Sequence, residues 1–233
     1  MFLFKYIIFL LLFLNNIKIN DGFNININRR NLFKKTLLMS SNINFQNNQE
    51  EEEEEEEEEA TIGRIDNDIY LTGSLNDNSC LKLTQTLIGY KKYIKNKEVD
   101  IDKINLYIQS PGGSLFSTLG LIDEIKNYDI PINTYIKGYA ASAATLLSVV
   151  GKERYMYNHS LLMIHGVKLT GSVNTLTDVR DLNDNVELYM DIIKNIYLEN
   201  SNMTEEELEY YFIRDKWMTS KQALHYGLID KIL

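Results

Sequence analysis

Three kinds of residue are scarce in this 233-residue chain, and each shortage excludes a class of protein. A single cysteine, Cys80, excludes a disulfide framework and a zinc site made of several cysteines. Three histidines leave little room for a metal site built on histidine, so we expect no metal. Prolines number only two, and hydrophobic residues make up 44% of the chain, which excludes wholesale disorder.

Excess positive charge is missing as well. The formal net charge is −9, which argues against a nucleic-acid-binding protein, because such proteins carry basic surfaces. Ten of the 33 acidic residues form one unbroken run of glutamates at 50–59. The remaining stretch, 60–233, is only mildly acidic and is long enough for one domain with a sound core.

The first sixty residues have the composition of a targeting leader followed by a spacer. Lys5 and the apolar run 6–14 predict a secretory signal peptide over residues 1–20, because the run is too short to span a membrane. Residues 21–49 are basic and rich in Asn, which is typical of a disordered, transit-like leader. The glutamates at 50–59 repel one another and predict a solvated spacer.

This leader also predicts a destination. A signal followed by a transit-like stretch resembles the leaders of proteins sent to complex plastids through the secretory pathway. The Asn- and Lys-rich usage resembles an apicomplexan proteome, so we expect a plastid of the apicoplast kind. The alternative is a secreted protein with a disordered tail, in the secretory lumen. In neither case do we expect a membrane segment in the mature protein.

Residues 60–233 alternate between strand-like and helix-like patterns, which predicts an α/β domain with a mostly parallel sheet. Short apolar runs predict strands at 69–72, 104–109, 132–136, 154–157 and 161–164. Helical spacing of apolar residues predicts helices at 81–93, 115–128, 140–150, 178–199, 204 onward and 219–226. Exposed sites in such folds lie where a strand ends and a helix begins.

The first candidate site is the segment GYAASAA at 138–144, between a predicted strand and a predicted helix. Ser142 is flanked by small residues that admit a substrate backbone, and the N–H groups at a helix start favour negative charge. A nucleophile beside an oxyanion hole needs both features. The alternative is a serine that caps the helix within an alanine-rich packing turn.

The second candidate site is the segment SPGGS at 110–114, directly after a predicted strand. Gly112 and Gly113 permit a positive φ and leave an N–H uncovered, which supplies the second donor of an oxyanion hole. The segment lacks the P-loop pattern, so we expect no nucleotide there. The alternative is a plain turn from strand to helix.

His165 and Asp215 are the candidates for a general base and its partner. His165 ends the predicted strand 161–164, a rigid place from which a base can act. Asp215 supplies a carboxylate of the kind that orients a base and stabilises its cation. The alternatives are a buried structural histidine and a surface ion pair, since Arg214 and Lys216 flank the aspartate.

Four motifs in this order resemble the proteolytic subunit of the Clp protease. They are INLYIQSPGGS at 104–114, GYAASAA at 138–144, MIH at 163–165 and RDKWMTSKQALHYGLID at 214–230. The resemblance spans roughly residues 62–233. It implies a crotonase-like fold, a repeated ββα superhelix, in which the helix at 178–199 is a protruding handle.

The resemblance also assigns roles in a serine endopeptidase. It implies Ser142 as nucleophile, His165 as general base and Asp215 as the orienting carboxylate. The N–H groups of Gly113 and Ala143 match the positions of the oxyanion hole. Substrate would bind as an added strand along two edges that contain Gly112, Ser114, Leu115, Gly166 and Val167.

The family resemblance further implies partners. Subunits would form heptameric rings, homomeric or mixed with a related subunit, and two rings would stack into a tetradecamer. An AAA+ unfoldase uses ATP to feed unfolded polypeptides into the ring, while the peptidase subunit itself needs no cofactor.

The sequence departs from the family pattern around the histidine and at the start of the domain. Gly166-Val167 replaces the usual Gln-Pro, Ala143 replaces a usual Met, the glycine-rich stretch is reduced at 169–172, and no axial pore segment is recognisable. These departures keep open the alternative of a catalytically weak or inactive structural subunit of a mixed Clp ring. An acyl-CoA enzyme of the crotonase superfamily is a third hypothesis, and the candidate triad argues against it.

Overall fold

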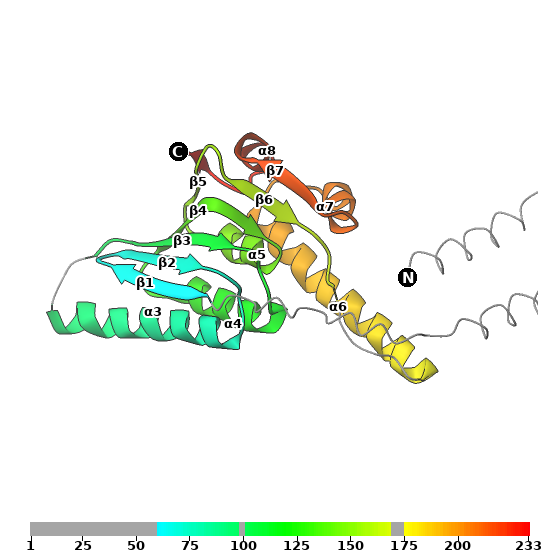
Figure 1. Ribbon diagram of the computed structural model, residues 1–233, viewed down its shortest axis with the longest axis horizontal. Helices are drawn as coiled ribbons and strands as arrows, with labels where there is room; N and C mark the ends of the chain where they lie inside the picture. Colours follow the sequence, from blue (N-terminus) through cyan, green and yellow to red (C-terminus); the bar gives the residue numbers. More distant parts are fainter. Residues whose placement is uncertain (1–59, 98–100, 169–174) are drawn as a thin grey trace, which may run out of the picture. The chain divides into compact units, whose positions relative to one another are not determined.

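The computed structural model describes residues 60–97, 101–168 and 175–233. The signal peptide, the transit-like leader and the glutamate spacer predicted at 1–59 lie outside the described residues, as does the stretch 169–172. Eight strands and six helices alternate along the described residues, as expected for an α/β domain (Figure 1).

One mixed sheet runs through the domain. Its path is β1-β2-β3-β4-β5-β8, with β6 added to β4 and β7 added to β6. The β1–β2 and β6–β7 pairs are antiparallel and the other pairs are parallel. The strands are Thr61–Ile65 (β1), Asp68–Thr72 (β2), Ile104–Ser110 (β3), Ile132–Ala141 (β4), Arg154–Met156 (β5), Leu161–Ile164 (β6), Lys216–Thr219 (β7) and Lys231–Ile232 (β8).

Strand β4 pairs first with β5 and then with β6 along its length. Its first half pairs with β5 through Thr134 to Ile136, and its last three residues pair with β6. Gly138 lies between the two halves with φ 82°, a conformation that glycine adopts at no steric cost. Because of this change of partner, the end of β4 lies beside β6, which in turn pairs with β7. The candidate site lies at this end of β4.

Six helices complete the domain. They are Asp77–Lys97 (α3), Leu115–Lys126 (α4), Ala143–Val149 (α5), Leu176–Asn200 (α6), Glu205–Phe212 (α7) and Ser220–His225 (α8). Both α3 and α4 lie along one face of the sheet (Figure 1). The helix predicted at 81–93 lies within α3, and Leu83, Leu87 and Tyr90 on its inner face are buried in the core.

The helix predicted at 140–150 begins later than expected. Ala140 and Ala141 are the last residues of β4, because they pair with Leu162 and Met163 of β6. Helix α5 begins at Ala143. Alanine has a high helix propensity, and the long-range strand pairing overrides that preference here.

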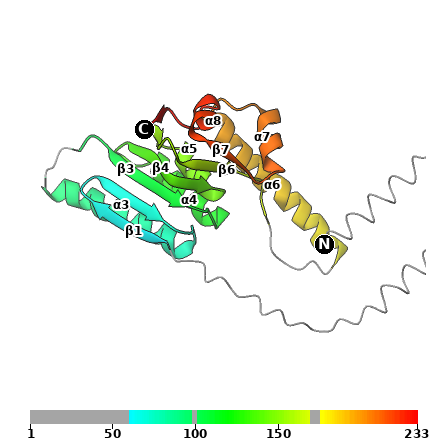
Figure 2. The ribbon, with the colours of Figure 1, turned by 45° about the horizontal axis from the view of Figure 1, so that its top comes forward.

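The long helix α6 begins at Leu176, two residues before the predicted start. Thr175 caps it in a capping box with Asp178, each side chain accepting from the other residue's backbone N–H. Its C-terminal part packs into the core through Ile193 and Tyr197. Its N-terminal part projects away from the sheet (Figures 1 and 2) and leaves Val179 and Leu188 more than half exposed.

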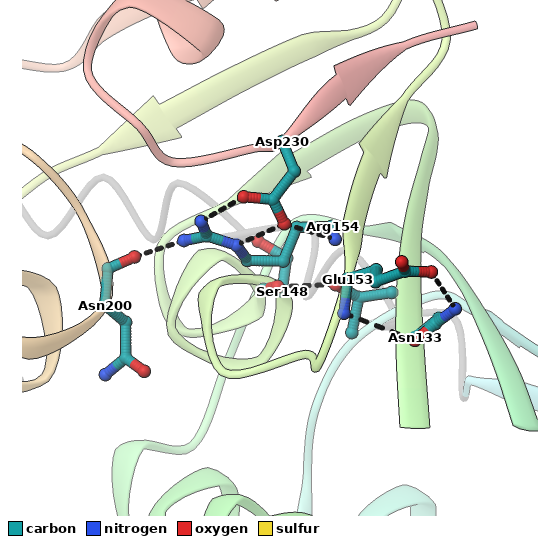
Figure 3. Close-up of polar contacts among 7 residues, drawn as sticks. Asn133, Ser148, Glu153, Arg154, Asn200 and Asp230 are labelled. Atoms are coloured by element: carbon teal, nitrogen blue, oxygen red, sulfur yellow. Dashed lines mark hydrogen bonds and ion pairs between the residues drawn. The ribbon is translucent and has the colours of Figure 1, made fainter. Parts of the chain in front are cut away.

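Arg154 links the segment before the C-terminal strand β8 to the rest of the domain. Arg154 of β5 donates from Nε and Nη2 to the two carboxylate oxygens of Asp230, at 3.0 and 2.5 Å. Its Nη1 donates to the carbonyl of Asn200, at the end of α6 (Figure 3). Next to it, the buried Asn133 donates to Glu153. Arg154 therefore joins β5, the end of α6 and the segment that leads into β8.

Within the described residues, no helix is both long enough and apolar enough to cross a membrane.

Candidate active site

Three neighbouring strand ends bring the predicted triad residues together. Ala141 of β4 pairs with Met163 of β6, and Ile164 of β6 pairs with Lys216 of β7. Ser142 directly follows β4 and His165 directly follows β6, while Asp215 directly precedes the antiparallel β7. Continuing the β6–β7 register by one position places His165 opposite Asp215.

Ser142 has the backbone of a strained junction. Its φ is 55° and its ψ is −130°, an uncommon conformation for a residue with a side chain. Its N–H donates to the carbonyl of Met163 at 2.9 Å. Although Ser142 occupies the N-cap position of α5, its side chain makes no capping hydrogen bond. The interpretation as an ordinary capping serine is therefore wrong, and Oγ is not used by the helix.

The Gly112–Gly113 loop lies directly against Ser142. A Cβ on Gly112 would lie 2.6 Å from the carbonyl oxygen of Ala141 and 2.7 Å from Cβ of Ser142. Gly112 has φ 93° and Gly113 has φ 144°, so both glycines have the positive φ that the sequence predicted. Only a residue without a side chain lets the two backbones approach this closely.

The loop keeps its place through hydrogen bonds with Leu75. The Leu75 N–H donates to the Gly112 carbonyl at 2.7 Å, and the Ser114 N–H donates to the Leu75 carbonyl at 2.6 Å. The N–H of Gly113 makes no hydrogen bond with any described residue. The N–H of Ala143 begins α5, and the first N–H groups of a helix have no partner inside it. Both N–H groups are thus available to a ligand.

A buried hydroxyl pair supports Ser142 from behind. Thr145 Oγ1 donates to the Ser142 carbonyl at 2.6 Å and lies 2.5 Å from the hydroxyl of Tyr197. Since Thr145 has one hydroxyl hydrogen, Tyr197 must donate to it. Burial raises the pKa of Tyr197, so its hydroxyl remains a donor. This chain connects α6 to the backbone of Ser142.

His165 and Asp215 have other partners in this structure. His165 is half-buried, and its Nδ1 lies 2.5 Å from the Gly166 carbonyl oxygen. Asp215 is exposed and accepts a hydrogen bond from Lys168 Nζ at 2.7 Å. That hydrogen bond, with the charges of Lys168 and His165, lowers the pKa of Asp215. Among the described residues, no hydrogen bond joins His165 to Ser142 or to Asp215.

Residues of both predicted substrate edges make hydrogen bonds within the chain. On the first edge, Ser114 caps α4 by accepting from the Ser117 N–H, and Leu115 begins that helix. On the second edge, the Gly166 N–H donates to the Phe212 carbonyl. The Val167 N–H donates to the sulfur of Met190 at 3.3 Å. Both of these N–H groups are therefore engaged within the chain.

Sequence reasoning missed Lys168, Thr145 and Tyr197. The only indication in the sequence that Lys168 belongs to the site is its charge, three residues after the candidate base His165. Thr145 and Tyr197 carried no signal, because their contact depends on how α6 packs against α5. No group of three or more His, Cys, Asp or Glu side chains suited to a metal ion occurs among the residues that the structure describes.

Comparison with known proteins identifies the family. The family model described as Clp protease matches residues 53–233. The ATP-dependent Clp protease proteolytic subunits of Streptococcus pneumoniae strains Hungary19A-6 and CGSP14 are each 29% identical to the chain over 171 residues. These matches cover 72% of this chain and 85% of each relative. The sheet and its helices agree with the crotonase-like fold of that family. The chain therefore belongs to the Clp protease family of serine-type peptidases.

Proposed function

We propose that this chain is the proteolytic subunit of a Clp-type protease and hydrolyses peptide bonds of unfolded polypeptides. The observation that carries the proposal is the environment of Ser142. This serine ends β4 with a positive φ, has a side chain not used for capping, and lies against the Gly112–Gly113 loop. Such backbone strain costs roughly 1–3 kcal/mol and is found mainly at functional sites.

In the proposed reaction, His165 takes the hydroxyl proton of Ser142 as Oγ attacks the peptide carbonyl. The carbonyl oxygen becomes an oxyanion, which accepts hydrogen bonds from the N–H groups of Gly113 and Ala143. His165 then gives the proton to the leaving amine, and an acyl-enzyme remains on Ser142. Water, deprotonated by His165, attacks this ester and releases the acid and the free serine. Asp215 orients His165 and stabilises its cation.

Substrate would bind as an extended strand beside the site. The proposed edges contain Gly112, Ser114 and Leu115 on one side and Gly166 and Val167 on the other. On the second edge, the Val167 N–H must exchange its present hydrogen bond to the sulfur of Met190 for a hydrogen bond to the substrate.

Assembly is the next part of the proposal. The exposed apolar residues Val179, Leu182 and Leu188 lie on the projecting part of α6, where a second copy could cover them. We infer heptameric rings stacked in pairs, homomeric or with a related Clp subunit. An AAA+ unfoldase would supply unfolded chains at the expense of ATP, in line with the relatives' description as ATP-dependent. The subunit itself would need no cofactor.

The location is proposed from the leader alone. Residues 1–49 would deliver the protein through the secretory pathway to a plastid of the apicoplast kind. A fluorescent protein fused after residue 49 should then reach the plastid, and retention in the secretory lumen would contradict this.

The function is tested by the degradation of a fluorescently labelled unfolded protein. The full chain should release labelled peptides, and Ser142→Ala and His165→Ala should abolish the release. His225→Ala is the matched control for the second variant, because His225 is an exposed residue of α8 outside the site. Degradation that persists in Ser142→Ala, or is absent from the assembled wild-type protein, contradicts the proposal.

A further inference from the structure

Two basic side chains compete for the carboxylate of Asp215. The register of β6 and β7, continued by one position, places His165 opposite Asp215. Lys168 Nζ nevertheless donates to Asp215 Oδ2, at 2.7 Å. The lysine thus holds the carboxylate that the proposed mechanism assigns to the histidine.

His165 has a substitute partner in this arrangement. Its Nδ1 lies 2.5 Å from the carbonyl oxygen of Gly166. A peptide carbonyl orients an imidazole ring, but it carries no net charge and stabilises the imidazolium cation less than a carboxylate does. Proton removal from Ser142 is therefore slower with the carbonyl than with Asp215 as the partner of His165.

The backbone on both sides of the ion pair is fixed. On one side, the segment 165–168 is held by the hydrogen bond from the Gly166 N–H to the Phe212 carbonyl at 2.9 Å. On the other side, Asp215 lies three residues beyond Phe212 and directly precedes β7. With the backbone held and Asp215 placed opposite His165 by the register, the exchange of Asp215 from Lys168 to His165 calls for rotation of its side chain.

The ion pair is open to solvent. The side chains of Lys168 and Asp215 are 63% and 57% exposed. Ion pairs this exposed shift an equilibrium by only a few-fold, and salt weakens them. The contact is therefore strong enough to slow the reaction and weak enough to open in every catalytic cycle.

We propose that Lys168 is a positioning residue that slows attack by Ser142 because it draws Asp215 away from His165. This inference rests on the proposed function of the chain. It adds a control on the triad by a residue that touches neither substrate nor the reacting atoms.

The test is the rate at which a fluorophosphonate labels Ser142 in the full chain. Lys168→Gln releases Asp215 to His165, so labelling should become about threefold faster. Lys168→Arg preserves the ion pair and should label at the wild-type rate. Lys216→Gln is the matched control, because Lys216 adjoins Asp215 in sequence but donates to the Tyr210 hydroxyl. Its labelling rate should equal that of the wild type.

Two more measurements separate this role from a general structural effect. In an Asp215→Asn background, Lys168→Gln should bring no acceleration, because there is no carboxylate to release. Raising the ionic strength should accelerate labelling of the wild type and leave Lys168→Gln unchanged.

The possible outcomes separate the role of Lys168 from the proposed peptidase function. Equal labelling rates of Ser142 in the wild type and in Lys168→Gln would overturn the role of Lys168 and leave the peptidase function standing. Acceleration that survives Asp215→Asn would overturn it as well. Absence of label from Ser142 in both proteins contradicts the proposed function itself, and the role of Lys168 fails with it.

Discussion

At the scale of single residues, the site depends on positions where a side chain is either required or forbidden. Gly112 is one forbidden position, since an added Cβ would meet the backbone of Ala141 and Ala143 at 2.6 and 2.8 Å. Its φ of 93° disfavours any other residue. The loop and the serine must therefore move apart if Gly112 is replaced.

Gly112→Ala should reduce labelling of Ser142 by a fluorophosphonate at least about tenfold, because it displaces the Gly113 N–H that we propose as an oxyanion donor. The matched control is Gly89→Ala, since nothing lies within 4 Å of a Cβ at that helical position. The control should label normally and gain about 0.5–1 kcal/mol of stability. Normal labelling of Gly112→Ala would show that the loop does not contribute to the site.

A second residue, Asp230, lies away from the site and makes the stability of the fold depend on pH. Burial raises the pKa of Asp230, but hydrogen bonds from Arg154 more than offset this, so the pKa lies below its ordinary value of 3.8. A carboxyl whose pKa is lower in the folded state contributes stability above its unfolded pKa. That stability is lost as the pH falls from 3.8 through the folded pKa.

Asp230→Asn should therefore be less stable than the wild type in urea at neutral pH, and the difference should shrink progressively below about pH 4. Asp123→Asn, on the outer part of α4, is the control and should show little difference at either pH. A stability difference for Asp230→Asn that is constant from neutral to acidic pH would contradict the assignment.

At the scale of elements, one buried pair of hydroxyl groups joins α5 to α6. Thr145 of α5 and Tyr197 of α6 are both buried and complete a hydrogen-bond chain to the Ser142 carbonyl. A buried polar group that loses its partner costs more than the hydrogen bond itself contributes. The joint therefore stabilises the fold and holds the strained serine.

Thr145→Val should lower the free energy of unfolding by about 1–3 kcal/mol, because it leaves the Tyr197 hydroxyl buried without an acceptor. Thr145→Ser keeps the hydroxyl and should lose much less stability. Urea unfolding of both variants measures the difference. Equal stability of the two variants would mean that the hydroxyl pair contributes nothing.

At the scale of the whole molecule, α6 is a helix whose apolar side chains the single chain buries only in part. Its C-terminal part lies in the core, whereas Val179, Leu182 and Leu188 are exposed by 51%, 38% and 55%. A second copy that covers these side chains would gain the hydrophobic free energy that the isolated chain forgoes.

Leu188→Glu should weaken assembly and shift the protein toward smaller species in analytical ultracentrifugation, because it introduces a charge into the proposed contact. Asn195→Glu adds the same charge to an exposed position in the C-terminal part of α6, outside the proposed contact, and should leave the assembly state unchanged. An unchanged assembly state in Leu188→Glu would exclude this part of α6 from the interface.

Much of this molecule could be predicted from sequence, and the exceptions have physical causes. Ser142, His165 and Asp215 lie next to apolar strands with recognisable motifs, and the sheet brings those strand ends together. The short strands β1, β7 and β8 were missed, because they carry few apolar residues and depend on their neighbours. The contact of Lys168 with Asp215 joins side chains 47 residues apart, which local patterns do not encode.

Peptide mass spectrometry of the fluorophosphonate-treated protein tests directly whether Ser142 is the nucleophile, because it locates the modified residue. One adduct is expected on Ser142 of the full chain. It should be lost in His165→Ala, which removes the proposed base, and retained in His225→Ala. A folded protein that carries no adduct, or carries it on another serine, would contradict the assignment of Ser142 as the nucleophile.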